Sequence, residues 1–128
     1  MGPGTPLRIV VVDDNEAVRM ILTDMLMDLG HQVVGEAEDF KTALEAYDSH
    51  KPDLVTLDLS LSAVGGADGF AVLRALRLRD ARAKVIIVSG NSQTKVYEQL
   101  EKEGAAAFVP KPIRGADLTA AIARATRA

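Results

Sequence analysis

Short apolar runs alternate with longer amphipathic segments along the whole chain. The runs are rich in β-branched residues and stop at turn residues, which is the pattern of strands buried on both faces. Five strands are therefore predicted, at residues 7–12, 32–35, 54–57, 84–88 and 107–109. The runs at 7–12, 54–57 and 84–88 are the most apolar, so we place these three strands in the middle of a sheet.

Each predicted strand is followed by a segment whose apolar residues recur at helical spacing. Five helices are predicted, at residues 15–29, 40–47, 69–78, 93–103 and 117–125. Gly30 and Gly104 follow the first and the fourth helix, and Lys51-Pro52 follows the second. Glycine and proline are typical of helix ends. The alternation of strand and helix predicts an α/β fold, a doubly wound parallel sheet with helices on both faces.

The length and the amino-acid composition exclude several classes of protein. The 128 residues are enough for one domain, which we expect at residues 7–128 behind a short disordered arm at 1–6. The absence of cysteine excludes disulfides, thiolate catalysis and cysteine-ligated metal centres. It is also typical of proteins that work in a reducing compartment.

Charge and hydropathy exclude two further classes of partner. Fifteen basic and eighteen acidic residues give a net charge of −3, with no run of Lys and Arg that would bind nucleic acid directly. No apolar run approaches the roughly 18 residues of a membrane span, and residues 1–6 lack the features of a signal peptide. We therefore expect a cytoplasmic protein that contacts neither nucleic acid nor a membrane.

Charged and polar residues follow four of the five predicted strands. Asp13 and Asp14 come after the first strand, Asp58 after the third, Ser89 after the fourth and Lys111 after the fifth. In an open parallel sheet the carboxyl ends of the strands lie at one edge, and ligands bind beyond that edge. We therefore expect these five side chains to form one site.

The charge of this site favours a divalent cation. Three carboxylates at −1 and one ammonium at +1 leave a net charge of −2. Carboxylates at close range repel one another unless a cation intervenes, and a set of oxygen ligands suits Mg²⁺ or Mn²⁺. Mg²⁺ that keeps coordination positions open for phosphate oxygens is typical of phosphoryl transfer. Lys111 would supply a positive charge, and Ser89 a hydroxyl donor, to the same oxygens.

The chain resembles the receiver domain of two-component response regulators. The resemblance lies in Asp13-Asp14 after the first strand, Asp58 after the third, Ser89 after the fourth and Lys111-Pro112 after the fifth. The resemblance extends from about Leu7 to the end of the chain. It implies a flavodoxin-like fold with the strand order 2-1-3-4-5, which is the order in the chemotaxis regulators.

The resemblance also implies a role for each acidic residue of the site. Asp58 is expected to be the phosphoacceptor, which attacks a phosphohistidine and becomes an acyl phosphate. Asp13 and Asp14 are expected to hold Mg²⁺ together with Asp58 and the backbone carbonyl of Ser60. Asp14 is the expected direct ligand of the pair.

The remaining site residues are implied to bind the phosphoryl group or to respond to it. Lys111 is expected to pair with phosphoryl oxygens, and the Lys111–Pro112 peptide bond is expected to be cis. Ser89 is expected to swing its hydroxyl to the phosphoryl group, and Phe108 to turn into the space that Ser89 vacates. Asn91 lies where the family tunes the lifetime of the phosphate.

The partners implied by the resemblance are proteins. A sensor histidine kinase or a phosphotransfer protein would donate the phosphoryl group. A downstream protein would bind the face formed by helix 93–103, strand 107–109 and helix 117–125, and a homodimer could pair through the same face. The domain would phosphorylate and dephosphorylate itself without turning over an external substrate, so it would not be an enzyme in the usual sense.

The segment after Asp58 departs from the family pattern. The family often carries Met-Pro-x-Met-Asp-Gly there, whereas this chain places Asp68-Gly69 ten residues after Asp58, about three positions later. Ser62 stands where the pattern has proline, and Gly65-Gly66 lies within the insertion. Two expectations depend on this altered segment: the position of the Ser60 carbonyl and the contacts with a kinase.

Other interpretations of the same residues are open at this point. Asp13-Asp14-Asn15 could simply cap the following helix. A degenerate receiver would bind partners without being phosphorylated. A Mg²⁺-dependent phosphohydrolase of the haloacid dehalogenase type would carry its nucleophile after the first strand, in the pattern Asp-x-Asp-x-Thr/Val. A flavin-binding module would need a hydroxyl-rich phosphate loop where this chain has Asp13-Asp14.

Overall fold

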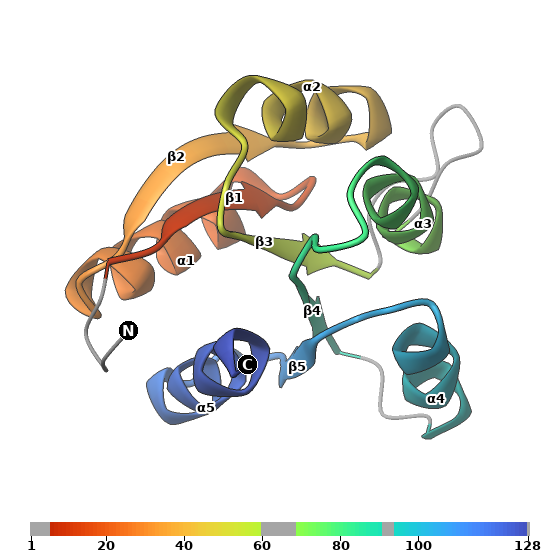
Figure 1. Ribbon diagram of the computed structural model, residues 1–128. Helices are drawn as coiled ribbons and strands as arrows, with labels where there is room; N and C mark the ends of the chain where they lie inside the picture. Colours follow the sequence, from red (N-terminus) through yellow and green to blue (C-terminus); the bar gives the residue numbers. More distant parts are fainter. Residues whose placement is uncertain (1–5, 60–68, 91–93, 128) are drawn as a thin grey trace.

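The computed structural model describes residues 6–59, 69–90 and 94–127, in which five strands alternate with five helices. Figure 1 shows the elements in the order in which the chain builds them. Their bounds are β1 (Arg8–Val12), α1 (Glu16–Asp28), β2 (Gln32–Ala37), α2 (Phe40–His50), β3 (Leu54–Asp58), α3 (Gly69–Arg79), β4 (Val85–Ser89), α4 (Thr94–Lys102), β5 (Ala107–Pro110) and α5 (Gly115–Thr126).

The strands form one parallel sheet in the order β2-β1-β3-β4-β5. This is the order 2-1-3-4-5 predicted from the family resemblance, so that prediction is confirmed. The three interior strands are β1, β3 and β4, which are also the three most apolar runs of the sequence. The physical reason is burial, because an interior strand is covered on both faces and both edges.

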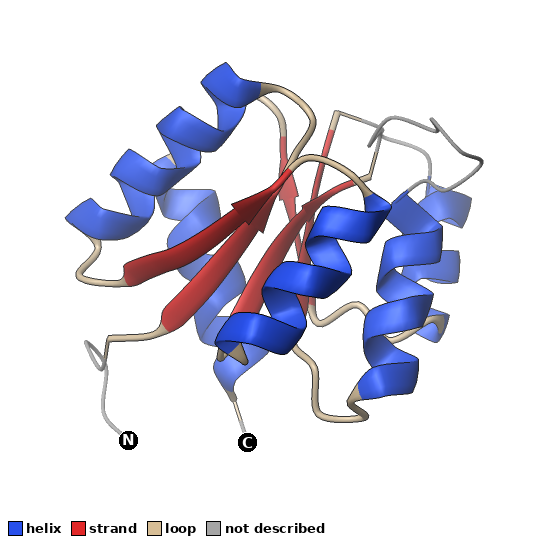
Figure 2. Ribbon diagram, turned by 90° about the horizontal axis from the view of Figure 1, so that it is seen from above, coloured by secondary structure: helices blue, strands red, loops and turns tan. Residues whose placement is uncertain are grey.

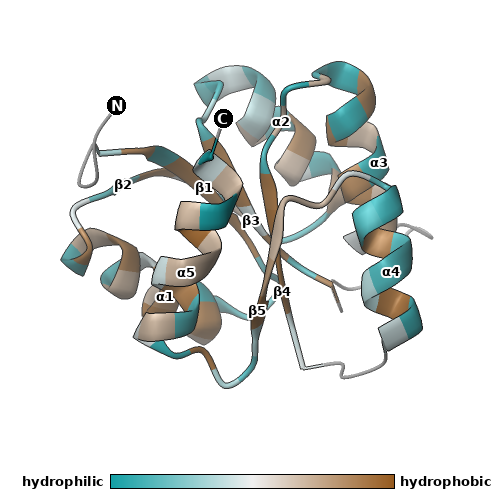
Figure 3. Cartoon of the chain, turned by 60° about the horizontal axis from the view of Figure 1, so that its bottom comes forward, coloured by the Kyte–Doolittle hydropathy of each residue, from teal (hydrophilic) through white to brown (hydrophobic). Residues whose placement is uncertain are grey.

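Helices cover both faces of the sheet (Figure 2). Side chains of α1 and α5 pack with Ile9 and Val11 of β1, and side chains of α2, α3 and α4 pack with Val10 and Val12. Successive residues of a strand point to opposite faces, so a strand between two helical layers is apolar at most positions, and Thr56 of β3 is a buried exception. Figure 3 shows the result as hydrophobic colour along much of the central strands, with hydrophilic colour on many outward positions of the helices.

The helix ends agree with the predicted stop signals, with two differences in length. Gly30 and Gly104 have φ of +93° and +100°, values that favour glycine at the end of a helix. Helix α2 continues to His50, three residues beyond the prediction, and Lys51 ends it in the left-handed conformation. Helix α5 begins at Gly115, two residues before the prediction, because its exposed first turn carries no apolar signal.

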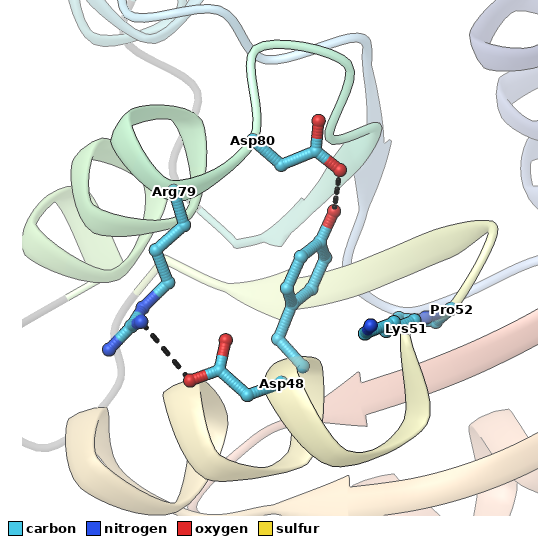
Figure 4. A pocket seen from close by; sticks show the side chains of 6 residues that line it. Asp48, Lys51, Pro52, Arg79 and Asp80 are labelled. Atoms are coloured by element: carbon cyan, nitrogen blue, oxygen red, sulfur yellow. Dashed lines mark hydrogen bonds and ion pairs between the residues drawn. The ribbon is translucent and has the colours of Figure 1, made fainter.

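A cleft of about 510 Å³ lies between the carboxyl ends of α2 and α3 (Figure 4). Two contacts join the helices there. The Tyr47 hydroxyl donates a hydrogen bond to Asp80 Oδ2 at 2.9 Å, and Arg79 Nη1 lies 3.1 Å from Asp48 Oδ2. Burial, together with the Asp80 carboxylate, raises the pKa of Tyr47 to about 12. The Tyr47–Asp80 contact therefore links the two helices only while the phenol is protonated.

Replacing Tyr47 with phenylalanine should lower the free energy of unfolding by about 1 kcal/mol at neutral pH, because one partly buried hydrogen bond is lost. The unfolded phenol ionises near its ordinary pKa of 10.0, whereas the folded phenol ionises near 12. The stability conferred by Tyr47 is therefore complete below pH 10 and is lost as the pH rises towards 12. Urea unfolding of both proteins from pH 8 to 12 measures this difference, and a constant gap between them would contradict the assignment.

Candidate functional site

The site lies at the carboxyl edge of the sheet, where four of the five strands contribute residues. Asp13 and Asp14 follow β1, Asp58 is the last residue of β3, Ser89 is the last residue of β4, and Lys111 follows β5. All neighbouring strands are parallel, so these ends meet at one edge. The backbone N–H of Lys111 donates to the Ser89 carbonyl at 3.0 Å, which holds the ends of β4 and β5 together.

Three carboxylates come together at this edge. One oxygen each of Asp13, Asp14 and Asp58 can be chosen so that all three lie within 4.8 Å of one another. Asp13 is 1% exposed and Asp58 2%, whereas Asp14 is exposed to solvent. The cluster therefore has two buried carboxylates and one open side, and its oxygen donors are of the type that Mg²⁺ prefers.

The Lys111 side chain reaches both buried carboxylates. Its Nζ lies 3.2 Å from Asp58 Oδ1 and 3.5 Å from Asp13 Oδ2, and the side chain is 28% exposed. The Lys111–Pro112 peptide bond that follows is cis. One ammonium thus faces two buried negative charges, which leaves the interior of the site short of positive charge.

The proton affinity of Asp13 reflects this imbalance. Burial raises the pKa of Asp13 above its ordinary value, and the nearby Asp58 carboxylate raises it further. The backbone N–H of Asn15, which donates to Asp13 Oδ1 at 2.8 Å, and the Lys111 ammonium act in the opposite direction without cancelling the rise. A cation bound between the carboxylates would favour the charged form of Asp13 and so oppose this rise in its pKa.

In the loop from β1 to α1, the residue that caps the helix is different from the residues that contribute carboxylates to the site. Asn15 is the N-cap of α1, and its side chain accepts from the backbone N–H groups of Ala17 and Val18 at 2.9 and 3.2 Å. Asp13 accepts from Asn15 instead, and within the described residues the Asp14 carboxylate has no hydrogen-bond or ion-pair partner. The capping interpretation therefore applies to Asn15 and leaves Asp14 directed to the site.

Comparison with known proteins identifies the family. The model of the response regulator receiver domain matches residues 9–123. The chain belongs to this family. Chemotaxis protein CheY of Bacillus subtilis is 36% identical to this receiver domain over 107 residues, 84% of this chain and 87% of CheY. The transcriptional regulatory protein PdtaR of Mycobacterium tuberculosis is 33% identical over 117 residues, which are 91% of this chain but 55% of PdtaR.

Solved structures of receivers have the same fold. A two-component response regulator of the LuxR family from Aurantimonas superposes with a TM-score of 0.85 at 30% identity, covering 93% of this chain and 84% of that one. The CheX-CheY-BeF3-Mg complex from Borrelia burgdorferi superposes with a TM-score of 0.85 at 26% identity, covering 91% and 87%. Receiver domains bind Mg²⁺ through a cluster of aspartates, and this receiver has such a cluster in Asp13, Asp14 and Asp58.

Phe108 of this receiver lies in β5, three residues before Lys111, and packs against the hydrophobic core. It is partly buried, and its ring meets the Tyr97 ring of α4 edge-on, with centroids 5.0 Å apart and planes at 74°. Edge-to-face contacts of this kind stabilise by about 1 kcal/mol beyond burial. The contact links α4 to the strand that carries Lys111.

Several predictions for this receiver fall outside the described residues. These are the metal ligand Ser60, the tuning residue Asn91, and the insertion with Ser62, Gly65-Gly66 and Asp68. No helix in the described ranges is long and apolar enough to cross a membrane. Arg19, which contacts the site through the backbone of Asp13, was not predicted from the sequence. Its only signal was a basic residue on the first helix soon after Asp13-Asp14.

Gly69, at the start of α3, packs directly on the backbone that carries Asp58. A Cβ at this position would lie 2.6 Å from the Leu59 carbonyl oxygen and 2.9 Å from the Asp58 carbonyl oxygen. Neither backbone atom can rotate away as a flexible side chain would. The close approach of α3 to the end of β3 therefore requires glycine.

Replacing Gly69 with alanine should destabilise the receiver by about 1–3 kcal/mol, because either α3 or the Asp58 backbone must move. Chemical denaturation with circular dichroism measures this loss. Gly115 is the matched control, since it also lies in the first turn of a helix and a Cβ there meets nothing within 4 Å. Gly115→Ala should leave stability unchanged or raise it. Equal losses in both variants would contradict the steric argument.

Proposed function

We propose that this receiver domain accepts a phosphoryl group on Asp58 from a sensor histidine kinase or a phosphotransfer protein, and that the modification changes the surface formed by α4, β5 and α5. The observation that carries the proposal is the convergence of three carboxylates and one ammonium at a single edge of the sheet. A phosphoacceptor needs an anionic nucleophile beside cations that neutralise the incoming phosphoryl oxygens.

In this proposal Asp13, Asp14 and Asp58 hold Mg²⁺, with the Ser60 carbonyl as a further ligand. The donors are all oxygen, and Mn²⁺ suits the same set. The exposed side of Asp14 leaves room for water and phosphoryl oxygens. When bound, the cation neutralises charge on the transferred group. The similar CheX-CheY complex from Borrelia burgdorferi was solved with BeF3 and Mg²⁺, which supports Mg²⁺ as the cation of this site.

The transfer uses Asp58 as the nucleophile. A carboxylate oxygen of Asp58 forms a bond to phosphorus, and the bond from phosphorus to the donor's histidine nitrogen breaks. That nitrogen keeps the electron pair and is protonated, so the products are a free histidine and an acyl phosphate. Lys111 Nζ, 3.2 Å from Asp58 Oδ1, moves its contact from the carboxylate to the phosphoryl oxygens. Water later hydrolyses the acyl phosphate and restores Asp58.

The response begins with the added charge. An acyl phosphate carries about one more negative charge than the carboxylate and brings new acceptor oxygens. We propose that the Ser89 hydroxyl donates to one of them and that Phe108 turns inward, which breaks its contact with Tyr97. Asn91 would then tune how long the phosphate survives. A downstream protein, or a second copy of the domain, would bind the altered α4-β5-α5 surface.

Incubation with acetyl phosphate and Mg²⁺ tests the proposal without knowledge of the kinase. Intact mass spectrometry should show one added phosphoryl group, and EDTA should prevent it. Binding of Mg²⁺ without any phosphorylation would contradict the acyl-phosphate chemistry and favour a receiver that binds partners unmodified. Sustained hydrolysis of a phosphomonoester such as p-nitrophenyl phosphate would contradict the signalling role and favour a phosphohydrolase.

A further inference from the structure

Arg19 of α1 binds the backbone of the acidic site. Its Nη1 donates to the Asp13 carbonyl oxygen at 2.7 Å, and its Nε donates to Glu36 Oε1 of β2 at 3.0 Å. The Arg19 side chain is only 14% exposed, while Glu36 is 49% exposed. The planar guanidinium therefore spans from β2 to the first peptide of the β1–α1 loop and is held at both ends.

The peptide unit that Arg19 binds is the one that joins Asp13 to Asp14. Its carbonyl belongs to Asp13 and its N–H to Asp14, so the orientation of this plane sets where the Asp14 side chain leaves the backbone. The other contacts of the loop fix Asp13, whose N–H donates to the Ala37 carbonyl and whose Oδ1 accepts from Asn15. The Asp14 carboxylate has no partner within the described residues, so only its backbone positions it.

We infer that Arg19 is a positioning residue for the proposed metal site: it fixes the Asp13–Asp14 peptide so that the Asp14 carboxylate faces Asp13 and Asp58. Glu36 in turn orients Arg19. This inference rests on the proposed Mg²⁺ site but assigns a residue to which that proposal gives no role. Partners that orient metal ligands typically contribute about 10–100-fold to metal affinity.

The direction in which Mg²⁺ affinity changes distinguishes a positioning role of Arg19 from a purely electrostatic one. Arg19 is a cation near a cation site, so a purely electrostatic role predicts that Arg19→Gln tightens Mg²⁺ binding and that Glu36→Gln weakens it. Positioning predicts that both variants weaken it. Arg19→Lys keeps the charge but lacks the planar fork that reaches both Asp13 and Glu36, so positioning predicts weaker binding there too.

The experiment is an Mg²⁺ titration of the receiver and its variants. Calorimetry measures the Kd, and NMR monitors the amide resonances of residues 13–15. We expect the Kd to rise about tenfold in Arg19→Gln and several-fold in Arg19→Lys and Glu36→Gln. The Asp14 amide resonance should also move in the metal-free Arg19 variants. Arg79→Gln is the control, because it removes the same charge from an ion pair at the far end of α3.

The outcomes distinguish this inference from the proposed function. Unchanged or tighter Mg²⁺ binding in Arg19→Gln, with normal binding by the parent protein, would overturn the positioning role and leave the proposed function intact. Absence of Mg²⁺ binding in the parent protein would overturn the proposed metal site itself. Thermal melts verify that each variant is folded, and Arg19→Lys, which keeps the buried charge, serves if Arg19→Gln unfolds.

Discussion

Replacement of Asp58 with asparagine is expected to abolish phosphorylation by acetyl phosphate. Asparagine has nearly the same shape but lacks the anionic oxygen that must attack phosphorus, so no acyl phosphate can form at this position. Asp58 is 2% exposed and lies 3.2 Å from Lys111, so the variant also removes one of two buried negative charges. The measurement is intact mass after incubation with Mg²⁺ and acetyl phosphate, which should be unchanged for the variant.

The matched control for this experiment is Asp28→Asn, which changes an exposed aspartate at the end of α1. It should be phosphorylated as fast as the parent protein. Peptide mapping of the phosphorylated parent should locate the modification on the peptide that contains Asp58. Phosphorylation of Asp58→Asn at the parent rate would show that a different residue accepts the phosphoryl group.

Replacement of Lys111 with methionine is expected to destabilise the metal-free protein by about 2 kcal/mol. Asp13 and Asp58 are almost fully buried, and Lys111 is the cation that both contact. Removing one partner of a buried ion pair costs about 3–5 kcal/mol, and the partial exposure of Lys111 reduces that cost. Urea unfolding in EDTA measures the loss, which is a large share of the roughly 5–15 kcal/mol that stabilises a typical domain.

Added Mg²⁺ or a lower pH should restore much of the stability that Lys111→Met loses. A divalent cation between the carboxylates would replace the missing charge, so the gap between variant and parent should narrow in Mg²⁺. The pKa of Asp13 is raised in the folded state, so protonation of Asp13 as the pH falls favours the folded over the unfolded chain. The difference in free energy of unfolding between Lys111→Met and the parent protein should therefore also become smaller towards low pH.

Two variants test this explanation of the Lys111 effect. Asp13→Asn removes one buried charge, so Lys111→Met should cost less in that background than in the parent protein. Lys95→Met is the control, because Lys95 is exposed on α4. A loss of stability in Lys111→Met that neither Mg²⁺ nor Asp13→Asn reduces would mean that packing, rather than charge, explains it.

The fold was largely predictable because each element carries its own signal. The β-branched runs at β1, β3 and β4 predicted interior strands, and Gly30 and Gly104 predicted helix ends. Apolar patterning indicated which three strands are interior, but the full strand order came from the family resemblance. The larger errors in length were at α2, α5 and β2. Capping by Lys51 and the exposed first turn of α5 have no hydrophobic period, and β2 continues two residues beyond the predicted 32–35, through Glu36 to Ala37.

The sequence by itself determined which residues could meet at the site, because parallel strands bring their carboxyl ends to one edge. Only the tertiary structure decided how they meet: Asn15 caps α1, while the Asp14 carboxylate has no partner among the residues that the structure describes. It also decided that Lys111 reaches both buried carboxylates and that Arg19 binds the Asp13 carbonyl. The physical reason is that strand ends follow from local patterning, whereas contacts between side chains distant in sequence depend on the packing of the whole fold.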